Sequence, residues 1–178
     1  KASRYMLERG VTSATDANTA PDEIEWFAAA VLSNRLQVRT NCMASWAAIV
    51  KQSGESDVPT PEALQPFRTG LDGHRLHVGQ AKLFSDGAIT TRTCLLWQPF
   101  EGMPGNYGIA MHDEEELREL IRKAHRAGWQ IATHAIGDRA IDQILDVYEA
   151  LSQRYDLVPL RPRIDHFVLG TEEQAKRA

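Results

Sequence analysis

Cysteine is scarce in this sequence, which has only Cys42 and Cys94 among 178 residues. Two distant cysteines do not make a disulfide framework, and both are expected to be reduced thiols, which favours a cytoplasmic location. No apolar run is long enough to cross a bilayer. Basic residues are not in excess, because 20 Lys and Arg stand against 24 Asp and Glu. Neither nucleic acid nor a membrane surface is therefore an expected partner.

The composition that remains is that of an ordinary globular protein, with 43% hydrophobic and 25% charged residues. Short apolar or β-branched segments alternate with segments of helical periodicity, about five times in all. Such alternation predicts an α/β fold with a parallel sheet. Five units suit part of an eight-stranded barrel, which needs about 250 residues when complete. They also suit a complete open sheet of flavodoxin type, and the pattern alone does not distinguish the partial barrel from the open sheet.

Two kinds of segment can be placed along the chain. Strands are expected at the following positions: Val11–Thr15, Leu36–Thr40, Leu76–Phe84, Trp129–Thr133 and a segment from Arg163 to about His166. Helices are expected to begin after four capping residues, namely Thr19, Asp113, Asp138 and Thr171. Residues 53–73 and 85–112 are rich in Gly and Pro and are predicted to be loops. The second loop is a candidate lid or binding loop.

Polar side chains fall at or near the carboxyl ends of the predicted strands, at Asp16, Asn41, Lys82, His134 and His166. That edge of a parallel sheet is where sites are built. Lysine and two histidines on three successive strands suggest a metal, because imidazole is a common ligand of zinc. A lysine in a buried strand is also costly unless it is paired, neutralised or modified.

Each of these residues has a simpler interpretation as well. A lone histidine after a strand is most often a core residue bonded to the backbone. Lys82 could pair with Asp86, and Asp138 could simply cap its helix. Asp86 and Arg92 lie in the loop after the lysine strand, where they could be solvated charges or contact a substrate. Trp97 could wall a pocket or pack in the loop.

Four segments together resemble amidohydrolase family 3, the relatives of N-substituted formamide deformylase. The resemblance spans nearly the whole chain in the right order, with Asp165 where the family usually has Glu. The matching segments are Val11–Asp16 (VTSATD), Ala81–Gly87 with Thr91–Thr93 (AKLFSDG and TRT), Gly128–Ala140 (GWQ and HAIGDRA) and Arg163–His166 (RIDH).

This resemblance implies a (β/α)8 TIM barrel of the metal-dependent hydrolase type. Residues 1–178 would form an internal fragment of its catalytic barrel, about strands 2 to 6 with their helices. The first strand, the last strands and a β-sandwich domain would be missing. Both ends of the chain, which read as interrupted helices, are consistent with a truncated piece.

The resemblance also implies roles for named residues. Lys82, carboxylated in many members of the superfamily, would be a metal ligand together with His134 and His166. The cofactor would be a divalent metal, with zinc as the first choice and one or two ions, or none in this fragment. Substrate contacts are expected from Asp86, Arg92 and Trp97, and support from Asp138, Arg139 and Asp165.

The implied activity is hydrolysis of an amide-like, non-peptide C–N bond in a small molecule by a metal-activated water. The general-base Asp is expected outside this segment, so the segment alone should be inactive. Open sheet edges predict a homo-oligomer. Two other hypotheses remain. One is a non-catalytic receiver-like or ligand-binding domain with an open sheet, in which Asp16 and Lys82 serve a phosphoryl switch. The other is a structural piece of an enzyme that has lost its activity.

Overall fold

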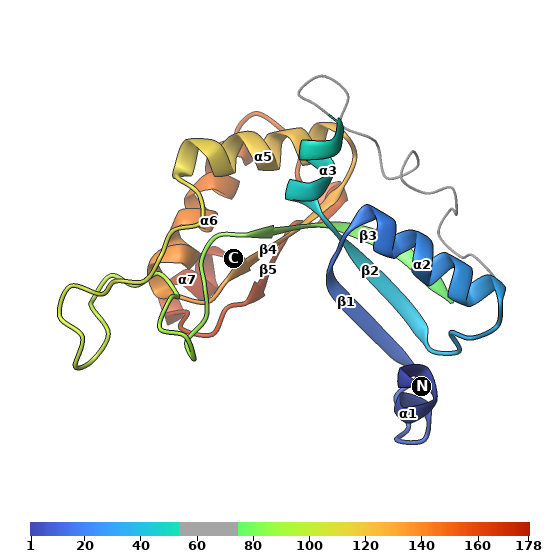
Figure 1. Cartoon of the computed structure of the whole chain (residues 1–178). Helices are drawn as coiled ribbons and strands as arrows, with labels where there is room; N and C mark the ends of the chain where they lie inside the picture. Colours follow the sequence, from blue (N-terminus) through green and yellow to red (C-terminus); the bar gives the residue numbers. More distant parts are fainter. Residues whose placement is uncertain (54–74) are drawn as a thin grey trace. The chain divides into compact units, whose positions relative to one another are not determined.

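The computed structural model describes residues 1–53 and 75–178 (Figure 1). The loop predicted for residues 53–73 therefore lies almost wholly outside the described residues. Five strands form one sheet in the order β1-β2-β3-β4-β5, and the β1–β2, β2–β3 and β4–β5 pairs are parallel. The strands are β1 (Ser13–Thr19), β2 (Arg39–Ser45), β3 (Leu76–Phe84), β4 (Gln130–Ala135) and β5 (Arg163–His166).

Helices alternate with these strands, as an α/β fold requires. They are α1 (Ala2–Leu7), α2 (Pro21–Leu32), α3 (Trp46–Ser53), α5 (Glu114–Arg126), α6 (Asp138–Ser152) and α7 (Glu172–Arg177), with a 3-10 turn, η1, at Val158–Leu160. None of the helices in the described ranges has both the length and the apolar character of a membrane-spanning segment.

The first two strands lie further along the chain than the sequence predicts. Asp16 and Asn41 were expected to end their strands, but both lie inside them. Thr19 was expected to cap α2, yet the residue before that helix is Ala20, whose N–H donates to the carboxylate of Glu23 (2.8 Å). Asp16 accepts a hydrogen bond from the Thr19 hydroxyl (2.8 Å), and Asn41 bonds to side chains of β3, so both polar residues are accommodated inside their strands.

The chain divides into two compact units, and the first comprises residues 1–82 and 127–130. Helix α2 packs on β2 through the apolar face formed by Ile24, Ala28 and Val31, which are all buried. Two large aromatic rings, those of Trp46 and Trp129, lie 6.2 Å apart in the same core. This burial of aliphatic and aromatic side chains is the main stabilising contribution to the unit.

The second unit comprises residues 83–126 and 131–178. Within it α5 packs on α6, and α7 packs along α6 (Figure 1). Helix α5 begins as predicted, with the Asp113 carboxylate accepting the backbone N–H of Glu116 (2.8 Å). Gly128, with φ of 80°, follows its end. Helix α7 has the predicted capping box between Thr171 and Gln174.

Candidate metal centre

Two of the predicted ligands, His134 and His166, lie in contact at the carboxyl ends of neighbouring strands of the second unit. In the β4–β5 register Ala135 is the partner of His166, so the two histidines are offset by one residue. The backbone of His166 has φ of 78°, which turns it out of the regular strand. The ring centroids are 4.6 Å apart and the planes meet at 72°. The structure thus brings together two of the three predicted ligands.

The ring of His134 is held from one side by oxygen acceptors. Its Nε2 lies 2.9 Å from the carbonyl oxygen of Gly87 and 3.3 Å from Oδ1 of Asp86. The Phe84 ring lies 5.2 Å away, centroid to centroid. A carbonyl and a carboxylate can only accept, so Nε2 carries a proton, and in the neutral imidazole the lone pair is then on Nδ1. This is the arrangement of a metal-ligating histidine, whose other nitrogen donates to a carbonyl or carboxylate.

Asp86 is the most heavily used polar side chain near this site, and it is only 2% exposed. Its carboxylate accepts three backbone N–H groups, from Leu95 (3.0 Å), Ile136 (3.1 Å) and Gly137 (2.8 Å). Together with His134 it joins the loop after β3 to the turn after β4. The predicted substrate contact of Asp86 stays a prediction, and the structure gives the residue a positioning function besides it.

The turn after β4 requires a glycine. A Cβ on Gly137 would lie 1.9 Å from the carbonyl oxygen of Leu95, far inside van der Waals contact. The close approach of these two backbones lets the Asp86 carboxylate reach N–H groups from both. Close packing against the Leu95 backbone therefore explains why the HAIGDRA segment has a glycine at position 137.

Lys82 is the last residue of the longer segment of the first unit and is only 3% exposed. In the sheet it is the partner of Ser45 on β2. Its convergence with His134 and His166 stays a prediction. Among residues 1–53 and 75–178, no group of three or more His, Cys, Asp or Glu side chains could hold a metal ion. A metal bound by the two histidines would therefore need Lys82 as a further ligand, ligands from residues outside the described ranges, or both.

The loop between β3 and α5 is folded on itself by backbone hydrogen bonds. The N–H groups of Leu96, Ile109 and Met111 donate to the carbonyls of Tyr107, Thr93 and Ser85, respectively (2.8–3.0 Å). These bonds give the loop a defined backbone path. Its role as a lid or binding loop stays a prediction.

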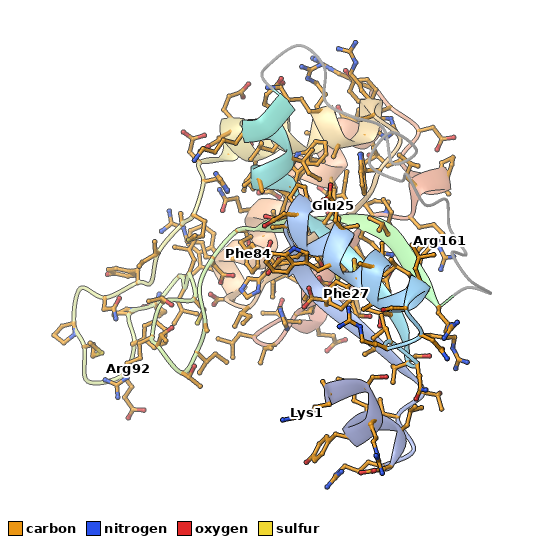
Figure 2. The ribbon with its side chains drawn as sticks, turned by 45° about the vertical axis from the view of Figure 1, so that its right-hand side comes forward. Lys1, Glu25, Phe27, Phe84, Arg92 and Arg161 are labelled. Atoms are coloured by element: carbon orange, nitrogen blue, oxygen red, sulfur yellow. The ribbon has the colours of Figure 1, made fainter. Side chains whose placement is uncertain are left out.

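The two loop residues predicted to contact substrate are bound within the second unit. Trp97 donates from its backbone N–H to Asp138 (3.1 Å) and from its indole to Asp142 (2.8 Å), and the Arg139 guanidinium lies 5.0 Å from its ring. Figure 2 shows Arg92 on the outer part of the loop, where Nη1 lies 3.0 Å from the Met103 sulfur.

The residues predicted to support the site all have structural partners. Asp138 and Arg139 hold the Trp97 segment against α6, as described above. Asp165 is buried and pairs with Arg163, whose Nη2 lies 2.6 Å from its Oδ1. Sequence reasoning did not single out Gly87, whose carbonyl binds His134, because a backbone acceptor leaves no side-chain signal.

Comparison with known proteins agrees with this architecture. The family model described as "Amidohydrolase family" matches residues 2–178, so the chain belongs to the amidohydrolase family. The Arabidopsis thaliana protein LONG AFTER FAR-RED 3 is 29% identical over 93% of this chain and 29% of its own length. N-substituted formamide deformylase from Arthrobacter pascens is 26% identical over 60% of this chain and 19% of its own length.

A solved structure shows the same fold. The crystal structure of an uncharacterized metal-dependent hydrolase from Pyrococcus horikoshii OT3 matches 99% of this chain with a TM-score of 0.77 and 27% identity. The chain covers 33% of that protein, and spans less than a third of the two relatives named above. The fold is therefore α/β and corresponds to part of a hydrolase TIM barrel, as predicted. The open-sheet receiver interpretation is left without support.

Proposed function

We propose that this chain supplies the central part of a metal-dependent hydrolase that cleaves an amide-like, non-peptide C–N bond in a small molecule. The observation that carries the proposal is the paired rings of His134 and His166, with Nε2 of His134 held by two oxygen acceptors. Membership of the amidohydrolase family and the likeness to a formamide deformylase support this reaction class.

In this proposal His134 and His166 bind a divalent metal, which we take to be zinc, because two imidazoles suit that ion. Lys82 is the third ligand, and its carboxylation would remove the cost of a buried ammonium group. The bound metal would lower the pKa of a water molecule and polarise the substrate carbonyl.

The chain's own residues prepare the site for this chemistry. The Gly87 carbonyl and the Asp86 carboxylate keep the proton of His134 on Nε2, so that Nδ1 stays available as a ligand. Phe84 packs against the same ring and limits its rotation. The hydrogen-bonded loop that contains Trp97 would cover the bound substrate and exclude water from it.

The proposal assigns no general base to the described residues near the histidine pair, because Asp86 is already bonded to three backbone amides. The carboxylate that takes the water proton is expected elsewhere in a longer protein. The isolated segment is therefore proposed to be inactive, although it carries metal ligands.

The test is metal analysis of the full-length gene product beside residues 1–178. After exposure to zinc and dialysis at neutral pH, the full-length protein should retain one or two equivalents. His134→Ala and His166→Ala should each abolish retention, whereas His125→Ala, a change on α5, should not. A full-length protein that binds neither zinc nor manganese would rule the proposal out.

A further inference from the structure

The pairing of β2 with β3 contains one extra residue. On the two sides of the irregularity the partners are Asn41–His77, Cys42–Val78, Met43–Gln80 and Ser45–Lys82. Gly79 has no partner in this register, so β3 carries a one-residue bulge at that position.

The bulge decides which face of the sheet Lys82 occupies. Side chains alternate along a strand, so residues five apart, such as His77 and Lys82, would point to opposite faces of a regular strand. With the extra residue both lie on the face of Asn41. The other face is apolar and buried, and it carries Cys42, Ala44, Leu76, Val78 and Ala81.

One side chain bridges the two sides of the bulge. The Asn41 amide oxygen lies 2.7 Å from Nδ1 of His77, and its amide nitrogen donates to Oε1 of Gln80 (2.8 Å). Gln80 in turn donates from Nε2 to Oε1 of Gln130 on β4 (2.7 Å). Asn41 thus holds the residues before and after the bulge at the same time.

The bulge residue is covered by the same cluster. A Cβ on Gly79 would lie 2.2 Å from Cε1 of His77 and 3.3 Å from the Asn41 amide oxygen. The imidazole therefore lies directly over the glycine, and a side chain at position 79 would displace it from Asn41.

We propose that Asn41, His77 and Gln80 are positioning residues that lock the Gly79 bulge and thereby keep Lys82 on the polar face of the sheet. The role of Lys82 as a metal ligand rests on the proposed function. The placement of its side chain on the polar face rests only on the strand register and on burial. Without the lock, β3 would favour regular alternation, which would drive the lysine toward the apolar face. Because an ammonium group is not tolerated there, the end of the strand would open instead.

The experiment measures how fast the Lys82 amine is acetylated in the folded chain, by peptide mass spectrometry after brief treatment with an amine-selective reagent. Asn41→Leu removes both hydrogen bonds at similar volume, and Gly79→Ala displaces the His77 ring. Both variants should raise the Lys82 labelling rate about tenfold or more, because local opening becomes more frequent. Thr40→Val is the matched control, since Thr40 is buried on the opposite face and its hydroxyl bonds to the carbonyl of Val38.

Urea unfolding of each variant shows whether it is folded, and if Asn41→Leu fails to fold, Gly79→Ala carries the test. Equal labelling of Lys82 in wild type and in the folded variants would overturn the proposal. The proposal would also be overturned if Thr40→Val, at the same unfolding free energy as the test variants, raised the Lys82 labelling rate equally, since that result would indicate a general increase in local opening. Labelling needs no metal, so a metal-free protein with a protected Lys82 would count against the proposed function alone. As a second readout, zinc affinity of the full-length protein should fall in Asn41→Leu and hold in Thr40→Val.

Discussion

The carboxylate of Asp86 and the imidazole of His134 meet at 3.3 Å in the second unit, and the same carboxylate accepts three backbone N–H groups. A single buried side chain therefore fixes the ring of a proposed metal ligand, the loop after β3 and the turn after β4. This dual use predicts that Asp86 contributes both to stability and to the proposed metal binding.

Asp86→Asn should weaken both properties. One oxygen becomes an NH2 group that faces a backbone N–H, so we expect a loss of about 2–3 kcal/mol in unfolding free energy. Zinc affinity of the full-length protein should fall about 10- to 100-fold, as for other residues that orient a ligand. Urea denaturation and metal titration measure the two effects. Asp113→Asn, which keeps a side-chain cap for α5, is the control and should change neither by much. A fully stable Asp86→Asn variant would show that the backbone bonds contribute little.

Gly137→Ala should be more damaging than Gly105→Ala. The first change places a Cβ 1.9 Å from the carbonyl oxygen of Leu95, whereas Gly105 has open space and only a positive φ of 88°. We expect about 1 kcal/mol for the strained backbone at Gly105 and a larger loss at Gly137. Thermal or urea unfolding of the two variants compares them directly. The reverse order would mean that the turn after β4 can relax.

His77 should make the chain less stable in mild acid. Burial lowers the pKa of His77 below its ordinary value of 6.5, so near that pH the unfolded chain binds more protons than the folded chain. The stability that His77 contributes is therefore complete above 6.5 and is lost as the pH falls toward the lowered pKa. The urea midpoint should drop between about pH 7.5 and pH 5.5, and less so in His77→Phe. An identical pH dependence in both proteins would contradict this assignment.

Both cysteines should resist alkylation in the folded protein. Burial raises the pKa of the Cys42 thiol to about 11 and also raises that of Cys94. Both are buried and neither forms a disulfide. Because the thiolate is the nucleophile, iodoacetamide at mildly alkaline pH should label neither residue until urea is added, when both should react. Mass spectrometry of native and unfolded samples distinguishes the two residues, and rapid labelling of native Cys42 would contradict its burial.

The second half of the chain could be predicted well because its signals are local. The Asp113 cap of α5, the capping box of α7 and the glycine after α5 each act within a few residues, and all lie where the sequence indicates. Two details differ: the Glu116 carboxylate pairs with His112 at 3.0 Å, and the residue before α6 is Gly137, so that Asp138 is the first residue of the helix and not its cap. The family resemblance identified the barrel type, which periodicity alone could not separate from an open sheet.

The bounds of β1 and β2 differ from the prediction because both strands are polar on one face, whereas β3 spans the predicted residues Leu76–Phe84. The sequence predicts the end of a strand at Asn41, since an amide side chain is unfavourable inside a strand unless it is bonded. Its partners, His77 and Gln80, are 36 and 39 residues away in sequence, so no local signal reveals them. The role of Asp86 was hidden in the same way, because the N–H groups that it accepts belong to the backbone.

The extra residue at Gly79 has a consequence for comparing homologous sequences. The number of residues that separate His77 from Lys82 determines whether that lysine lies on the polar or the apolar face of the sheet, so an alignment that shifts a gap across this interval would match residues on opposite faces. Relatives that have the lysine but lose one residue in the interval should be grouped with those that lack it. Spacing, in addition to identity, is then the character that an evolutionary survey of this site should score.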